Sequence, residues 1–194
     1  EKPSRIQDLA IPKIISGKDI IGQSQSGTGK TGAFSIGTLC QIDETKNSTQ
    51  ALIISPTHEL AHQSYNVIKE LSSYTKITSC KVIGGTNIHA SREELNKNPH
   101  IIVGTPGRIL DMITRKYLFT SDIKVVILDE ADEILSYGFK ETIHNIVLMI
   151  SKECQICLFS ATMTDDILEL TNQFMNNPEK LLIQNSQLTL EGIK

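Results

Sequence analysis

The sequence predicts an α/β fold of the doubly wound kind, with a mostly parallel sheet of about seven strands between two layers of helices. Short apolar runs alternate along the chain with segments in which apolar residues recur every three or four positions. The runs are apolar throughout, as expected of strands that are buried on both faces of a parallel sheet. A glycine-rich segment directly after the first run marks a tight turn from a strand into a helix.

Length and composition favour a single domain. The 194 residues can bury roughly 70% of their unfolded surface without disulfides or structural metals. The net charge of −3 gives no global basic field, and 5% aromatic residues with no Trp argue against a base-stacking platform. Any contact with nucleic acid is therefore expected to be local. The sequence contains no secretory h-region and no apolar run of membrane-spanning length, so we expect an intracellular protein, cytoplasmic or nuclear.

The first helix is predicted from a capping box. Ser4 is the expected N-cap, and Gln7, three residues later, can return a hydrogen bond to the Ser4 backbone. The helix is expected to run to about Ile15. A turn at Gly17 then leads into the first strand, over residues 19–22.

Residues 24–31, Ser-Gln-Ser-Gly-Thr-Gly-Lys-Thr, follow this strand and predict a phosphate-binding loop. A helix that begins directly after a strand points its first free amides at one spot, which favours an anion. Glycines let the backbone approach a phosphate, Lys30 can reach the outer phosphates, and the Thr31 hydroxyl suits a magnesium ion. The usual pattern opens with Gly where this chain has Ser24. The predicted phosphate contacts are Ser26, Gly27, Thr28, Gly29, Lys30 and Thr31.

The remaining elements follow at regular intervals. Further strands are expected over residues 51–55, 80–83, 101–103, 124–128, 155–159 and 181–183. Between them, helical faces are predicted for Ala33, Ile36, Gly37 and Cys40; Leu60, Ser64, Val67 and Leu71; Phe139, Ile143, Ile146, Val147 and Ile150; and Ile167, Leu170, Phe174 and Met175. Because the carboxyl ends of parallel strands share one edge, the short polar segments after these strands are expected to meet there.

Two acids follow the strand of residues 124–128. Asp129 can hold magnesium opposite the Thr31 hydroxyl, and Glu130 is placed to act as a general base or to orient an attacking water. The alternative is that both acids are solvated caps of the helix that begins near Asp132. The phosphate-binding loop in the same chain favours the nucleotide interpretation.

Two other motifs point to metals. His58-Glu59-Leu60-Ala61-His62 matches H-E-x-x-H, the zinc-protease signature. If Leu60 faces the core, both imidazoles fall on the polar side of the helix, and no third His follows at the metzincin spacing, so we interpret them as a solvated face. Cys154 and Cys157 form Cys-x-x-Cys, a possible redox pair or half zinc site, but they adjoin an apolar run and are interpreted as core thiols.

Taken together, these motifs resemble the first RecA-like domain of DEAD-box ATP-dependent RNA helicases, most closely the initiation factor 4A subgroup. The matching segments are residues 1–7, 25–31, 56–61, 84–85, 105–108, 129–132, 160–162 and 188–194. The resemblance implies a RecA-like P-loop domain over residues 1–187. It also implies that residues 188–194 begin a linker to a second RecA-like domain, which this fragment lacks together with its arginine finger.

The resemblance implies roles for single residues, with ATP and magnesium as cofactors. Gln7 would read the adenine, while Lys30, Asp129 and Glu130 would be catalytic. Asp132, Ser160 and Thr162 would couple the nucleotide state to RNA unwinding. The RNA backbone would be held by Pro56, Thr57, Gly84, Gly85, Thr105, Pro106, Gly107 and Arg108. Independently, three strand-to-helix junctions with free amides and one Arg predict phosphate binding that is indifferent to base sequence.

The implied parent is an enzyme that hydrolyses ATP to unwind or remodel RNA, as in translation initiation, while this fragment alone would be nearly inactive. One departure from the family pattern is His58, which stands where Arg is usual; another is Ser24, which stands where Ala is usual. An alternative is an ATP-gated RNA clamp that anchors partner proteins, such as scaffold proteins of translation or RNA processing. A DNA translocase is a third hypothesis.

Overall fold

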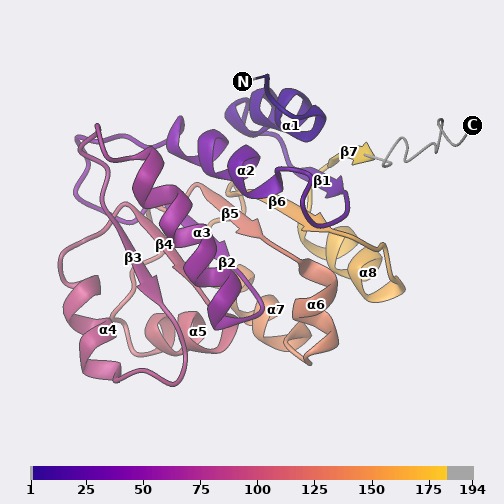
Figure 1. Ribbon diagram of the computed structural model, residues 1–194. Helices are drawn as coiled ribbons and strands as arrows, with labels where there is room; N and C mark the ends of the chain where they lie inside the picture. The colour runs from indigo at the N-terminus through magenta and orange to yellow at the C-terminus, as the bar shows by residue number, and fades with distance from the viewer. Residues whose placement is uncertain (1, 183–194) are drawn as a thin grey trace, which may run out of the picture.

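The structure, a computed structural model, describes residues 2–182, which form a sheet of seven strands in the order β3-β4-β2-β5-β6-β1-β7 (Figure 1). All neighbouring strands are parallel, which confirms the predicted doubly wound α/β fold. The strands are β1 Ile20–Gln23, β2 Ala51–Ile54, β3 Ser79–Val82, β4 Ile101–Gly104, β5 Val125–Leu128, β6 Gln155–Ser160 and β7 Glu179–Leu182.

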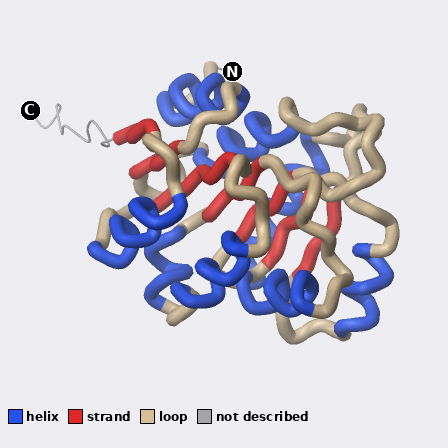
Figure 2. The backbone as a smooth tube through the Cα atoms, turned by 180° about the vertical axis from the view of Figure 1, so that it is seen from behind, coloured by secondary structure: helices blue, strands red, loops and turns tan. Residues whose placement is uncertain are grey.

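Helices cover both faces of the sheet, as Figure 2 shows from behind. One buried cluster joins one face to α1 (Arg5–Ile15), α2 (Lys30–Leu39) and α3 (His58–Leu71). A second cluster joins the other face to α4 (Ile88–Leu95), α5 (Pro106–Thr114), α6 (Ala131–Ser136), α7 (Lys140–Leu148) and α8 (Asp165–Phe174). Four of the five inner strands, β2, β4, β5 and β6, are buried along their whole length, as their apolar runs predict.

The capping box of α1 is present. The Ser4 backbone N–H donates to Gln7 Oε1 at 2.9 Å, and the Gln7 backbone N–H donates to Ser4 Oγ at 3.4 Å. The helix ends at Ile15, as predicted. This box fixes the position of the Gln7 side chain close to the glycine-rich loop.

The predicted face of α3 is confirmed only at Ser64, because the buried face is rotated away from Leu71. Its buried residues are Ala61, Ser64 and Ile68, whereas Leu71 is 43% exposed. Two of these side chains are small, and small side chains let a helix approach a sheet closely, so the position of the large apolar residues does not set the buried face. Cys40, predicted on the buried face of α2, is the C-cap residue of that helix and is exposed.

The two edge strands differ from the inner ones. Residues in β3 alternate between buried and half-buried, and in β7 only Leu181 is buried. The prediction of strands that are apolar and buried throughout therefore fails at both edges. Residue 183, expected to end the last strand, and the expected linker over residues 188–194 lie outside the described residues. Within residues 2–182, no helix is both long and apolar enough to span a bilayer.

Candidate functional site

The predicted site segments meet at the carboxyl edge of the sheet. The Ser24 backbone N–H donates to the Ser160 carbonyl at 3.1 Å, which places the glycine-rich loop beside the end of β6. The Asp129 N–H donates to the Ile54 carbonyl at 2.9 Å, so the acidic turn lies beside the end of β2. Strand order thus brings together segments that lie far apart in the sequence.

The glycine-rich loop has a backbone that only glycine adopts easily. Gly27 and Gly29 have φ of 81° and 95°, in the left-handed region. A Cβ on Gly29 would lie 2.7 Å from Ser4 Oγ. Ser24 is buried and its hydroxyl accepts a hydrogen bond from Thr28 Oγ1 at 3.1 Å, so the serine that replaces a small apolar residue here helps to close the loop. Because α2 begins without a side-chain cap, its first amides remain available to an anion.

Lys30 is buried in the cleft that the loop encloses. Its ammonium donates to the Ser24 carbonyl at 3.2 Å and to Glu130 Oε1 at 3.0 Å. The cleft has a volume of about 410 Å³ and is lined by Ser26, Gly27, Gly29, Lys30, Thr31, Leu60, Gln63, Ser64, Asp129 and Glu130. Three of these, Leu60, Gln63 and Ser64, come from α3 and were not predicted to take part. Ser64 was predicted on the buried face of α3, but no sequence motif marked it, Leu60 or Gln63 as part of this cleft.

The two acids after β5 differ in environment. Asp129 is 4% exposed, and its pKa is raised to about 7, first because burial disfavours its charged form and then because of the Glu130 charge. Glu130 has φ 49° and ψ 54°, a left-handed conformation that costs a non-glycine residue about 1 kcal/mol or more. Its carboxylate does not cap α6 and instead bonds Lys30, which contradicts the alternative that it is a solvated cap.

Gln7 lies against the glycine-rich loop. Its Nε2 donates to the Gly29 carbonyl at 3.4 Å. A Cβ added to Gly32 would lie 2.9 Å from the same Nε2, so the first turn of α2 packs directly beneath this amide. The structure therefore brings Gln7 to the loop across 22 residues of sequence.

The side chains in the first cleft could supply only some of the ligands of a metal ion. Among residues 2–182, no group of three or more His, Cys, Asp or Glu side chains could hold an ion. Thr31 and Asp129 line one cleft, and a magnesium ion bound through one or two protein oxygens completes its shell with water and phosphate oxygens. The residues present thus fit magnesium that arrives with a nucleotide.

The two histidines of the H-E-x-x-H segment are exposed, as predicted. His62 Nδ1 lies 2.6 Å from Lys81 Nζ, and the His58 ring lies beside Gly84 and Gly85. Of the two Cys-x-x-Cys residues, Cys157 is fully buried, whereas Cys154 is half-buried; burial raises the pKa of both thiols, to about 12 for Cys154, as expected of unreactive thiols.

A second cleft, of about 440 Å³, holds most of the residues predicted to bind RNA. It is lined by Pro56, His58, Gly84, Thr105, Gly107, Arg108, Asp111 and Phe139. Thr105 Oγ1 accepts from the Gly84 N–H at 3.2 Å, and Thr57 caps α3 by accepting from the Leu60 N–H at 3.2 Å. Three strand ends thus border the same hollow.

The Arg108 guanidinium forms hydrogen bonds with other groups of the protein. Its guanidinium donates to the Thr86 carbonyl at 2.8 Å, to Thr86 Oγ1 at 3.3 Å and to Ser91 Oγ at 3.0 Å. All three acceptors are neutral, so the guanidinium keeps the positive charge that the sequence predicts here while it fixes the loop between β3 and α4. This loop carries Gly85, which has φ 70°.

Asp132 joins the acidic turn to the end of β6. Its Oδ2 accepts from the Thr162 backbone N–H at 3.1 Å and from Thr162 Oγ1 at 2.9 Å. Ser160 Oγ donates to the Thr162 carbonyl at 2.7 Å. The three predicted coupling residues are therefore in direct contact within this domain.

The sequence matches known proteins along its whole length. The family model "DEAD/DEAH box helicase" matches residues 4–170. The chain is 52% identical over 194 residues to "ATP-dependent RNA helicase eIF4A" of Candida albicans and 50% identical to "Eukaryotic initiation factor 4A" of Drosophila melanogaster. The matches cover all of this chain and 49% and 48% of those proteins, so the chain spans about half the length of the curated relatives it matches.

Solved structures show the same fold. A DEAD box protein from Methanococcus jannaschii superimposes with a TM-score of 0.90 at 38% identity, over 93% of this chain and 50% of that one. A variant of S. cerevisiae Dbp5 bound to RNA and ADP BeF3 gives a TM-score of 0.84 at 35% identity, over 95% and 47% of the two chains. Motifs, geometry and relatives agree: the chain belongs to the DEAD/DEAH box helicase family.

Proposed function

We propose that this chain is the amino-terminal, ATP-binding domain of an ATP-dependent RNA helicase. The observation that carries the proposal is the single cleft in which the glycine-rich loop, Lys30 and the two acids after β5 converge. The relatives named ATP-dependent RNA helicases support it. The parent would hydrolyse ATP to unwind or remodel RNA when this domain is joined to a second one.

The loop and α1 would hold the nucleotide. The first amides of α2 and the Lys30 ammonium bind phosphate oxygens, and the left-handed glycines keep side chains out of the phosphate position. Gln7 carries an amide next to the loop, with both a donor and an acceptor, which suits the edge of an adenine.

Thr31 and Asp129 would hold magnesium, which neutralises charge on the transferred phosphate when it is bound. Asp129 would ionise on binding the cation, because metal ligands must be deprotonated. Glu130, once separated from Lys30, would accept a hydrogen bond from the attacking water and take up its proton.

The second cleft would bind the RNA backbone through amides at the ends of β2, β3 and β4. Contacts between backbone amides and phosphates do not distinguish one base from another, so we expect binding that is independent of RNA sequence. The link from Asp132 to Thr162 lies between the acids and β6, so it would carry a change at the nucleotide to the RNA side, a coupling role shared with Ser160.

The experiment compares this chain with its parent. Removing an arginine finger costs a thousandfold or more in related phosphoryl transfer, so this chain is expected to bind ADP and ATP with magnesium but to show almost no turnover, even with RNA. The parent, which would carry the second domain and a linker starting near residues 188–194, is expected to hydrolyse ATP in response to RNA. Rapid RNA-stimulated hydrolysis by this chain alone would contradict the proposal.

A second candidate is an ATP-gated RNA clamp that anchors other proteins. It is favoured by solved relatives that hold partners, such as a Dbp5 variant bound to Nup159 and Gle1. Slow release of RNA from the parent with a non-hydrolysable ATP analogue and partner proteins would support the clamp. Because relatives are initiation factors, we place the parent inside the cell, in the cytoplasm or the nucleus.

A further inference from the structure

One stripe of basic and aromatic side chains runs along α3 away from the second cleft. Residues 58, 62, 65 and 69 are spaced by four, three and four, so His58, His62, Tyr65 and Lys69 lie on one helical face. Lys81, from the edge strand β3, contacts the same stripe. We call these five residues the α3 stripe.

The positive charges of the α3 stripe are held in place without an acid. Lys81 Nζ lies 2.6 Å from His62 Nδ1 and 5.5 Å from the centre of the Tyr65 ring, and Lys69 Nζ lies 6.0 Å from the same ring centre. Both distances suit cation–π attraction. Within residues 2–182, neither lysine forms an ion pair with a carboxylate.

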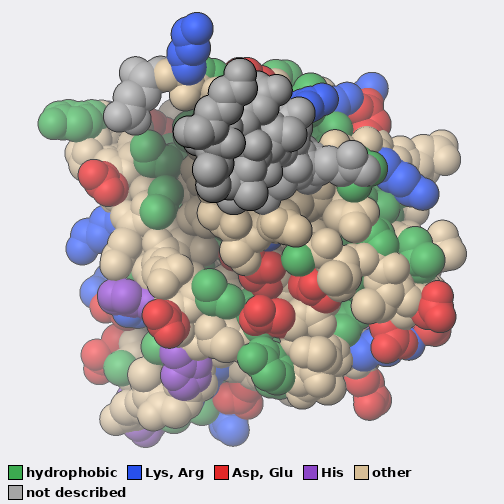
Figure 3. All heavy atoms as spheres, turned by 45° about the vertical axis from the view of Figure 1, so that its right-hand side comes forward, with side chains coloured by type: hydrophobic (Ala, Val, Ile, Leu, Met, Phe, Trp, Pro, Cys, Tyr) green, Lys and Arg blue, Asp and Glu red, His purple; other side chains and the backbone are tan. Residues whose placement is uncertain are grey.

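Acids of the same helix point elsewhere. Glu59 and Glu70 each follow a stripe residue by one position, which turns them about 100° around the helix axis. The space-filling view shows histidine side chains at the lower left, with acidic side chains beside them and near the centre of the same face (Figure 3). A chain of net charge −3 therefore has a local strip of positive charge.

The α3 stripe begins inside the cleft assigned to RNA. His58 lines that cleft, and a Cβ on Gly84 or Gly85 would lie 3.5 or 3.4 Å from its ring. From His58 to Lys69 the helix rises about 16 Å, a length over which one strand places several phosphates. We propose that the α3 stripe extends the RNA-binding surface and holds the phosphates of single-stranded RNA that leaves the second cleft. The proposal rests on the RNA binding proposed above.

The experiment measures binding of two oligouridylates, of about six and about twelve nucleotides, to the parent protein with magnesium and a non-hydrolysable ATP analogue. The double variant Lys69→Glu and Lys81→Glu is expected to bind the shorter RNA like the wild type and the longer RNA about tenfold more weakly at low salt. The slope of log affinity against log salt for the longer RNA should fall by about 1.4, because two phosphate contacts are lost.

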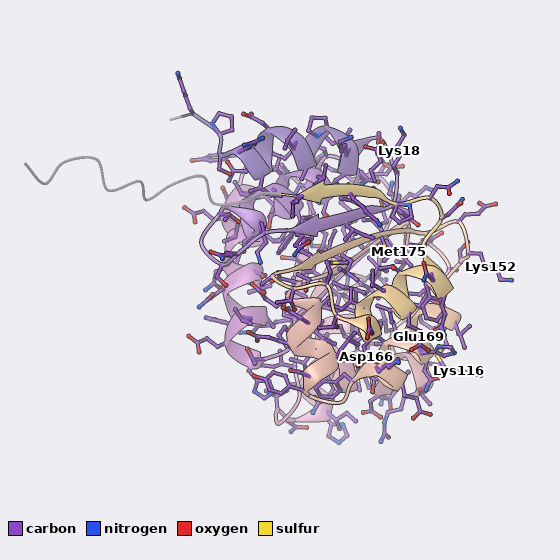
Figure 4. The ribbon with its side chains drawn as sticks, turned by 90° about the vertical axis from the view of Figure 1, so that its right-hand side faces the viewer. Lys18, Lys116, Lys152, Asp166, Glu169 and Met175 are labelled. Atoms are coloured by element: carbon purple, nitrogen blue, oxygen red, sulfur yellow. The ribbon has the colours of Figure 1, made fainter. Side chains whose placement is uncertain are left out.

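The matched control replaces two lysines outside the α3 stripe. Lys116 follows α5 and Lys152 precedes β6, and both are exposed (Figure 4), so Lys116→Glu with Lys152→Glu makes the same change in net charge and should leave the affinity for both RNAs unchanged. Urea unfolding of every variant verifies that the fold is intact.

Three outcomes would overturn the proposal. An equal loss of affinity for both RNAs would show that Lys69 and Lys81 act on RNA within the second cleft and not beyond it. An unchanged affinity for the longer RNA would show that the α3 stripe does not bind RNA, and an acidic protein would then be the candidate partner of this surface. Failure of the wild-type parent to bind either RNA would overturn the proposed function together with this extension.

Discussion

Lys30 Nζ and Glu130 Oε1 are 3.0 Å apart, so the cation of the glycine-rich loop and the second acid after β5 neutralise each other across the cleft. Their side chains are 5% and 12% exposed, and water and salt therefore screen this attraction only weakly. A nucleotide phosphate bound at Lys30, as proposed above, would lie near the Glu130 carboxylate, and we expect the two anions to compete for the ammonium.

Replacing Glu130 with Gln should therefore separate binding from hydrolysis. The amide keeps a hydrogen-bond acceptor but removes the competing charge, so the affinity of this chain for ADP, measured by fluorescence titration, should rise severalfold. RNA-stimulated ATP hydrolysis by the parent should fall by roughly a hundredfold or more, as for loss of a general base. Lys30→Ala is the control, and it should lose nucleotide binding. Weaker binding by the Gln variant would argue against competition.

Gln7 should decide between adenine and guanine nucleotides. Gln7→Ala is expected to weaken ADP binding and to reduce the preference for ADP over GDP. The same change removes the capping box, so Ser4→Ala is the matched control. The Ser4 variant should lose about 1 kcal/mol of unfolding free energy but keep its nucleotide preference. A loss of preference in both variants would show that the cap, and not the amide, matters.

Asp129→Asn should stabilise the domain when no metal is bound. The pKa of Asp129 in the folded state, about 7, lies above the unfolded value near 3.8, so the folded protein holds an extra proton between these values and loses stability as the pH rises through them. The gain in melting temperature from Asn should be small at pH 4 and grow to a few degrees, corresponding to about 1 kcal/mol, by pH 8.

Asp43→Asn serves as the comparison for this pH series. Hydrogen bonds from Thr45 lower the pKa of Asp43, so its charged form stabilises the fold above the unfolded pKa and that contribution disappears as the pH falls. Substitution there should not raise the melting temperature at pH 8. A pH-independent gain for the Asp129 variant would show that its charge is not the cause.

Gly104 should not tolerate a side chain. A Cβ at this last residue of β4 would lie 2.1 Å from the Val82 carbonyl oxygen in the neighbouring strand. Gly104→Ala is expected to lower the unfolding free energy in urea by about 3 kcal/mol. At Gly107 the nearest atom is 4.0 Å away, so Gly107→Ala should cost far less. Similar losses at both glycines would contradict a steric origin.

Thr162 should matter for unwinding more than for ATP binding. Thr162→Ala removes the hydroxyl bond to Asp132, whereas Thr162→Ser keeps it. In the parent, the Ala variant should bind ATP normally and unwind a short RNA duplex much more slowly, and the Ser variant should restore unwinding. If both variants unwind like the wild type, the contact is structural.

The fold and much of the site could be predicted because they depend on local sequence signals. Buried parallel strands need continuous apolar runs, and the Ser4 box and the glycine-rich loop are each determined within a few residues. Strand order then brought the predicted residues to one edge.

Other features depend on contacts between distant residues and carry no local signal. The hydrogen bonds of Arg108 were not predicted, because its partners Thr86 and Ser91 lie 22 and 17 residues away. The bond between Asp132 and Thr162 spans 30 residues. The buried face of α3 consists of Ala61, Ser64 and Ile68, and of these the sequence pattern predicted only Ser64.

The left-handed backbone of Glu130 has a consequence for laboratory evolution. Glycine or Asn adopts φ 49° more readily than Glu, and an uncharged residue at Asp129 would be easier to bury. A screen that rewards heat resistance alone would therefore select replacements at both acids. Its winners would be more stable proteins that have lost the groups proposed for ATP hydrolysis, so such a screen needs a parallel assay for activity.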